Sequence, residues 1–127
     1  MRLKREKCPC CGLPTIEERG IFDICELCHW EDDGQDDPNA DEVWGGPNGD
    51  YSLTEARKNF KEHLIMYRDR RNIEKQTDKE VELKKSLISM FVELDKCKPD
   101  SLEYEALWRK IKSYEKILME ISYETYG

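Results

Sequence analysis

The sequence predicts a small α+β protein in which a cysteine-rich unit over residues 1–51 precedes a helical region over residues 52–127. Five of the six cysteines fall within residues 8–28. Glycine and proline are frequent up to about residue 50, whereas apolar residues recur at helical spacings only after that point. A length of 127 residues suits one domain, or one small domain with an extension.

The cysteines form two C-x2-C pairs, Cys8 with Cys11 and Cys25 with Cys28, separated by thirteen residues. Two residues between thiolates allow both sulfurs of a tight turn to bind one ion, and Gly12 allows the positive φ of such a turn. Four thiolates predict one closed, tetrahedral Zn²⁺ site per chain. Iron in a rubredoxin-like site and a thiol redox site are the alternatives.

Two residues beside these pairs offer further ligands. Cys10 is expected to be a non-ligand, because Cys8 and Cys11 reproduce the spacing of the second pair. In its alternative role, Cys10 is a redox-active thiol paired with Cys8. That role needs a free Cys8 thiol, which is lost when Cys8 binds a metal. His29 follows Cys28 directly, so three thiolates with one imidazole form an alternative site. Adjacent residues rarely both reach one ion, so a packed or solvent-facing His29 is favoured.

The charge is concentrated in one stretch. The net charge is −7, and between residues 20 and 56 there are eleven acids and no Lys or Arg. A solvated loop is one interpretation, but interleaved aromatic residues favour a surface that binds a basic partner. The absence of Lys and Arg from this stretch argues against binding to nucleic acid or to an anionic membrane. The candidate contact residues are Trp30, Asp32, Asp33, Asp36, Asp37 and Trp44.

A first helix is expected over about residues 52–75. Ser52 and Glu55 form an S-x-x-E capping box, in which the hydroxyl and the carboxylate each accept from a backbone amide at the helix start. The apolar stripe behind it comprises Leu53, Ala56, Phe60, Leu64 and Tyr67.

A helical hairpin is expected over about residues 78–125. Its two stripes are Leu83, Leu87, Phe91 and Leu94, then Leu107, Ile111, Tyr114, Leu118 and Ile121. Pro99 separates them, and Asp100 or Ser101 can cap the second helix. Core packing is the ordinary meaning of such stripes; the alternative is a face for a partner or a second copy. Cys97 is expected to be a small apolar filler.

The sequence contains no recognisable catalytic motif and no apolar segment long enough to span a membrane. It contains no nucleophile–base signature, Walker loop, GxGxxG or HExxH motif, so we expect no enzyme activity. No apolar segment follows the basic N-terminus, and no run of 18 apolar residues occurs. We therefore expect a cytoplasmic protein, in which clustered cysteines favour metal over disulfides.

Four blocks occur in order along the chain: CPCCG at 8–12, IFDICELCHWEDDGQDDP at 21–38, GGPNG at 45–49 and SLTEARKNF at 52–60. Together they resemble the cysteine-rich CPCC family of small bacterial proteins, over roughly residues 7–67. The resemblance implies a zinc-ribbon-like N-terminal fold with Cys8, Cys11, Cys25 and Cys28 as ligands. Some members of the family are similar to immunity proteins of polymorphic or contact-dependent toxin systems.

The first functional hypothesis is an immunity or inhibitor protein that binds a basic toxin, such as a nuclease, through the acidic loop around residues 30–50. The alternatives are a zinc-ribbon adaptor or regulator acting through its helices, including a phage- or defence-related factor, and a nucleic-acid-binding zinc ribbon. A redox or electron-transfer enzyme is the remaining alternative.

Overall fold

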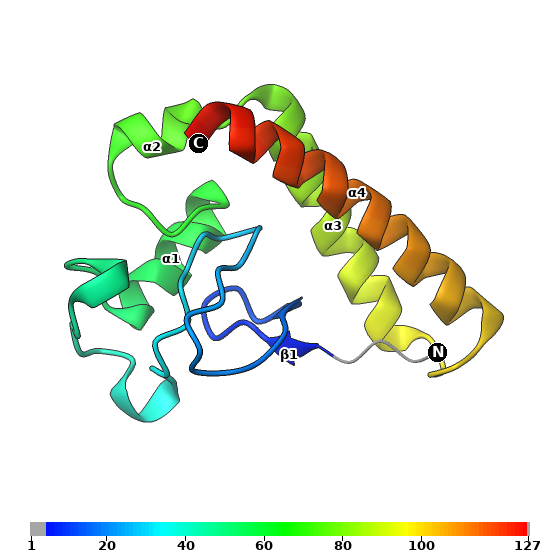
Figure 1. The fold of residues 1–127 in the computed structure, drawn as a ribbon, viewed down its shortest axis with the longest axis horizontal. Coiled ribbons are helices and arrows are strands. Elements are labelled where there is room, and N and C mark those ends of the chain that lie inside the picture. Colours follow the sequence, from blue (N-terminus) through cyan, green and yellow to red (C-terminus); the bar gives the residue numbers. More distant parts are fainter. Residues whose placement is uncertain (1–4, 127) are drawn as a thin grey trace. The chain divides into compact units, whose positions relative to one another are not determined.

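A computed structural model describes residues 5–126, and the side chains up to residue 124. It is a small α+β fold in which a two-stranded sheet lies near the clustered cysteines and helices follow (Figure 1). This confirms the predicted fold class. The elements in chain order are β1 (Glu6–Lys7), β2 (Pro14–Ile16), the short 3-10 helices η1 (Asp37–Asn39) and η2 (Gly46–Asn48), and the helices α1 (Leu53–His63), α2 (Arg70–Lys75), α3 (Asp78–Lys96) and α4 (Leu102–Tyr126).

Two short antiparallel pairs hold the cysteine turns. Strands β1 and β2 pair with the register Glu6 to Ile16, so the first C-x2-C turn lies in the connection between them. The second turn lies inside an isolated bridge between Ile24 and Glu31. Each cysteine pair is therefore placed at the tip of a β-hairpin-like loop, which restricts where its two sulfurs can point.

Helix α1 begins as expected but ends early. The Ser52 hydroxyl accepts from the Glu55 amide at 3.1 Å, whereas the Glu55 carboxylate binds Arg68 and does not complete the capping box. Leu64 takes the left-handed conformation, with φ of 63°, and ends the helix after His63. The prediction of one helix over residues 52–75 is therefore wrong beyond His63, because α2 is a separate helix.

Hydrogen bonds join α1 to the cysteine-rich loops. The Arg57 guanidinium donates to the carbonyl of Pro9 at 2.9 Å, and the Thr54 amide donates to the carbonyl of Ala40 at 2.9 Å. The chain accordingly divides into two compact units between Glu74 and Lys75. The boundary expected between residues 51 and 52 thus falls inside the first unit.

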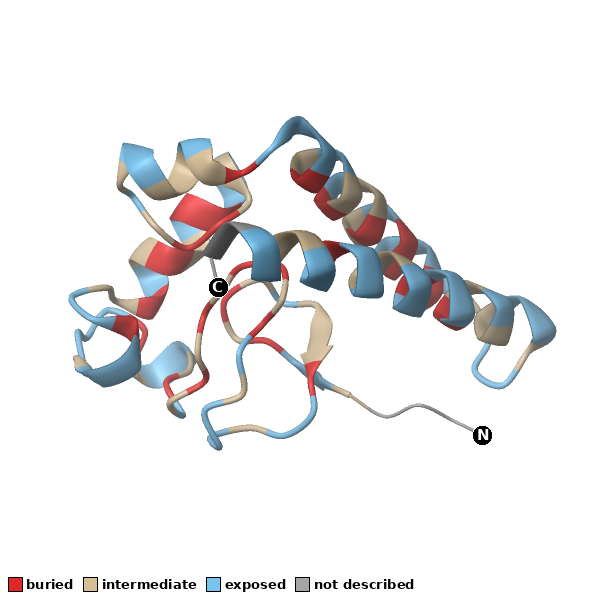
Figure 2. Cartoon of the chain, turned by 45° about the horizontal axis from the view of Figure 1, so that its top comes forward, coloured by how far each residue is buried: buried red, intermediate tan, exposed pale blue. Residues whose placement is uncertain are grey.

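The second unit is the predicted helical hairpin. Ser101 accepts from the Tyr104 amide at 3.1 Å and caps α4, which runs beside α3 in the opposite direction (Figure 1). The Phe91 and Trp108 rings meet edge to face with centroids 6.1 Å apart. Figure 2 shows buried residues along both helices, and Leu87, Ile111 and Leu118 are fully buried. Among the described residues, no helix combines the length and apolarity that crossing a membrane requires.

Candidate metal centre

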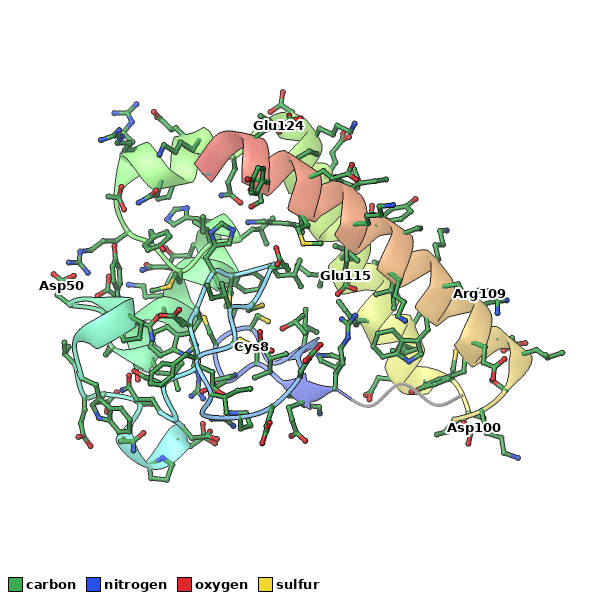
Figure 3. All side chains as sticks on the ribbon, viewed as in Figure 1. Cys8, Asp50, Asp100, Arg109, Glu115 and Glu124 are labelled. Carbon is green, nitrogen blue, oxygen red and sulfur yellow. The ribbon has the colours of Figure 1, made fainter. Side chains whose placement is uncertain are left out.

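Four cysteine sulfurs come together in the first unit. The sulfurs of Cys8, Cys11, Cys25 and Cys28 all lie within 4.8 Å of one another, and other sulfur atoms gather near Cys8 in Figure 3. Three of these residues are buried, and Cys11 is half-buried. These are the four residues in which the sequence analysis placed the ligands.

The spacing of the sulfurs fits one tetrahedral metal ion. The Sγ atoms of Cys8 and Cys28 are 3.6 Å apart, and those of Cys11 and Cys25 are 3.7 Å apart. A tetrahedron with metal–sulfur bonds of about 2.3 Å has neighbouring sulfurs about 3.8 Å apart. The six cysteines are free thiols, so the four in the cluster can act as ligands. They could hold a metal ion with only small movements.

The two cysteine turns have the same backbone design. The Gly12 amide donates to the carbonyl of Cys8 at 2.8 Å, and the His29 amide donates to that of Cys25 at 2.9 Å. Both donors have positive φ, 77° at Gly12 and 71° at His29. The conformation expected for Gly12 is confirmed. His29 occupies the equivalent position at a conformational cost of about 1–2 kcal/mol, and its ring packs edge-on against Tyr67.

Asn48 of the GGPNG turn holds the bridge residue Glu31, which follows the second cysteine turn. The side-chain amide of buried Asn48 accepts from the Glu31 amide at 3.0 Å and donates to the Glu31 carbonyl at 2.7 Å. It therefore imitates a neighbouring β-strand. The sequence analysis noted this turn as a motif but did not find the role of Asn48, since a side chain acting as a strand leaves no periodic signal.

Hydrogen bonds within the cluster shift the pKa values of Cys25 and Cys28 in opposite directions. Burial raises the pKa of Cys28 well above its ordinary value. Burial would also raise the pKa of Cys25, but hydrogen bonds from the other cysteines and from Thr15 outweigh it and hold that pKa well below the ordinary value. Cys25 is thus more easily deprotonated than Cys28, and a cysteine must lose its proton to bind a metal.

The two remaining cysteines lie outside the four-sulfur cluster. Cys10 is buried, yet it is not a member of the group of residues that could hold an ion. Cys97 is the half-buried C-cap of α3 in the helical hairpin.

The structure changes the interpretation of two predicted partner-binding residues. Trp30 and Asp32 are each fully buried, so neither offers a surface to a partner. Asp32 accepts from Arg19 Nε at 2.7 Å, from the Gly20 amide at 2.8 Å and from the Gly34 amide at 3.1 Å. Its negative charge organises the loop that contains it. Asp32 and Trp30 are therefore structural residues of this unit.

Arginines from outside the acidic stretch neutralise other acids within it. Arg19 Nη1 contacts Asp36 at 2.7 Å and holds the pKa of that carboxyl below its ordinary value. Arg57 Nη2 contacts Asp37 at 2.7 Å, and Arg68 pairs with Asp50. The stretch therefore presents less uncompensated charge than its composition suggests.

The last two candidates are Asp33 and Trp44. Asp33 is half-buried and accepts from the Gln35 amide at 3.1 Å. Trp44 is 46% exposed and Val43 is 56% exposed, between the exposed acids Asp41 and Glu42 and the GGPNG turn. We call residues 41–44 the acidic–aromatic loop. A partner can reach its side chains, as it can the 81% exposed side chain of Asp37.

Replacing Asp32 with alanine is expected to lower the free energy of unfolding by about 2–4 kcal/mol, because two backbone amides and one guanidinium lose a buried acceptor. Urea denaturation of the metal-loaded protein measures it. Asp33→Ala is the matched control, with an expected loss below about 1 kcal/mol, because it removes a single hydrogen bond. Equal losses in the two variants would contradict the special role of Asp32.

Comparison with known protein families gives one match. The cysteine-rich CPCC family matches residues 6–80, which include all four clustered cysteines, the GGPNG turn, α1 and α2. Neither the curated proteins nor the solved structures that were compared gave a match. The match covers more than half of the chain and agrees with the resemblance seen in its motifs. This chain belongs to the cysteine-rich CPCC family.

Proposed function

We propose that this chain is a non-catalytic bacterial protein-interaction module whose first unit is held together by one structural Zn²⁺ ion. The cluster of four sulfurs within 4.8 Å carries this proposal. Four protein thiolates fill a tetrahedral site completely, so the ion has no open position for water or substrate. Zn²⁺ also has no redox chemistry, which suits an ion that only holds chain segments together.

Metal analysis of the purified protein tests whether an ion is bound and which metal it is. We expect one zinc per chain, no visible absorption, and the same metal content in Cys10→Ser. A ferric tetrathiolate is coloured, so one iron per chain with visible absorption would overturn the assignment to zinc. The absence of any bound metal would overturn the centre itself.

The partner that we propose is a basic protein, and the activity is that of an immunity or inhibitor protein neutralising a basic toxin, such as a nuclease. The net charge of −7 favours attraction to a positively charged surface. The acidic–aromatic loop adds an exposed anchor, because Trp44 lies within three residues of Asp41 and Glu42. Exposed aromatic residues often contribute most of the binding energy of an interface.

Binding kinetics with a partner isolated from the source cells would test this surface. The double variant Asp41→Asn with Glu42→Gln should slow association, since long-range attraction acts before contact and is screened by salt. Trp44→Ala should speed dissociation by about tenfold or more, because it removes an interface anchor. Asp33→Asn is the control for a general loss of charge.

Two results decide against this surface. Unchanged association in the double variant at low salt would exclude the acidic–aromatic loop. A loss of binding in Leu102→Ala or Tyr123→Ala would instead favour the adaptor function. That candidate rests on the exposure of these two α4 side chains, 86% and 79%.

A further inference from the structure

One hydroxyl group lies against a sulfur of the four-cysteine cluster. Thr15 Oγ1 is 3.0 Å from Cys25 Sγ. Thr15 is the central residue of β2, between Pro14, which pairs with Lys7, and Ile16, which pairs with Glu6. Its β-branched side chain has few rotamers. Together with the approach of the sulfurs, this contact joins the first hairpin to the second cysteine turn.

The direction of this hydrogen bond follows from the chemistry of a metal ligand. A thiolate bound to a metal has no proton and can only accept, so the hydroxyl must donate. The other acceptor near the hydroxyl is the carbonyl of Leu13, at 3.4 Å. The shorter contact and the negative charge of the thiolate both direct the proton to Cys25.

The hydrogen bond from Thr15 also spreads part of the negative charge of the metal centre. Four thiolates around one Zn²⁺ leave a net charge of −2, and three of the four cysteines are buried. A donor that shares part of this charge stabilises the loaded centre and makes the sulfur a weaker nucleophile. Removing the partners of metal ligands typically lowers metal affinity 10–100-fold.

We propose that Thr15 is a positioning residue of the metal centre, whose hydroxyl orients the Cys25 thiolate and reduces its charge. This inference rests on the proposed metal site. It assigns a specific role to a residue that is not itself a ligand. It also explains why a polar side chain is placed in β2 immediately before the buried Ile16.

Zinc affinity of the full chain, measured by competition with a chromophoric chelator, tests the inference. Thr15→Val keeps the shape of the side chain and removes the hydroxyl, and Val suits a strand. We expect it to weaken Zn²⁺ binding 10–100-fold, while Thr15→Ser stays close to wild type. Thr54→Val is the matched control, because the Thr54 hydroxyl binds Asp41 and no sulfur. Thr15→Ala provides a second variant without the hydroxyl if the valine variant does not fold.

A spectroscopic measurement separates this role from a purely structural one. With Co²⁺ in place of Zn²⁺, the sulfur-to-cobalt charge-transfer band should move to longer wavelength in Thr15→Val, because the thiolate holds its electrons less tightly. Alkylation of the zinc-loaded variant by iodoacetamide should also be faster.

The outcomes distinguish the two proposals. If the wild type binds neither Zn²⁺ nor Co²⁺, the metal centre itself is wrong. If the wild type binds metal and the hydroxyl-free variants have the same affinity and charge-transfer band, the role of Thr15 is wrong. Equal weakening in Thr15→Ser would also contradict the role of the hydroxyl.

Discussion

Removal of the metal is expected to unfold the first unit up to Glu74. Structural zinc contributes on the order of 10–16 kcal/mol of apparent binding free energy to small domains, which is as large as the whole free energy of unfolding of a typical protein, about 5–15 kcal/mol. Cys25→Ser should have the same effect, because it removes a ligand. The unfolded region should include α1, since Arg57 of that helix donates to the carbonyl of Pro9 at 2.9 Å. Hydrogen exchange with and without a chelator measures the extent of unfolding.

The control for this experiment is Cys10→Ser, which changes a buried thiol outside the four-sulfur cluster. It should keep its metal and its amide protection. Equal loss of metal in the serine variants of Cys10 and Cys25 would refute the exclusion of Cys10 from the ligand set. Full protection of the first unit after complete removal of metal would refute the structural role of the ion.

The sulfur cluster was predictable because its determinants are local. Two residues between cysteines set how both sulfurs of one turn can point, and Cys10 does not fit that spacing. The helical hairpin was predictable for a similar reason. Its apolar spacing, Pro99 and the cap at Ser101 are all signals read within a few neighbouring residues.

The end of α1 was not predictable from local signals. The apolar stripe continues through Leu64 and Tyr67, which favours a longer helix. In the structure, the Asn59 side chain donates to the carbonyl of Met66 at 2.8 Å, and the Met66 amide donates to the backbone carbonyl of Cys28. These bonds require the chain to leave the helix at Leu64, so tertiary contacts override the helical preference.

The partner-binding residues were harder still to predict from the sequence. The charge counted along a segment does not include ion pairs with residues outside that segment. Arg19, Arg57 and Arg68 all lie outside the acidic stretch, yet each binds an acid within it. Segment charge therefore indicated an acidic region, but it did not identify which members reach solvent.

Leu118→Asp is expected to lower the free energy of unfolding of the helical hairpin by on the order of 3–5 kcal/mol. Leu118 is fully buried on α4, so the variant exchanges apolar packing for a carboxylate without a partner. Met119→Asp is the matched control at the next position, where the side chain is 50% exposed. Leucine and methionine have similar helix propensities, so both variants carry nearly the same intrinsic cost of aspartate in a helix.

Hydrogen exchange in α3 and α4, together with urea denaturation followed by circular dichroism, measures both variants in the metal-loaded protein. The control should lose less than about 1 kcal/mol, which is the difference in intrinsic propensity. A large loss in Leu118→Asp alone would establish that this part of the stripe is core. If both variants are equally stable, Leu118 does not pack in the interior, and its face of α4 is available to a partner, as the adaptor function requires.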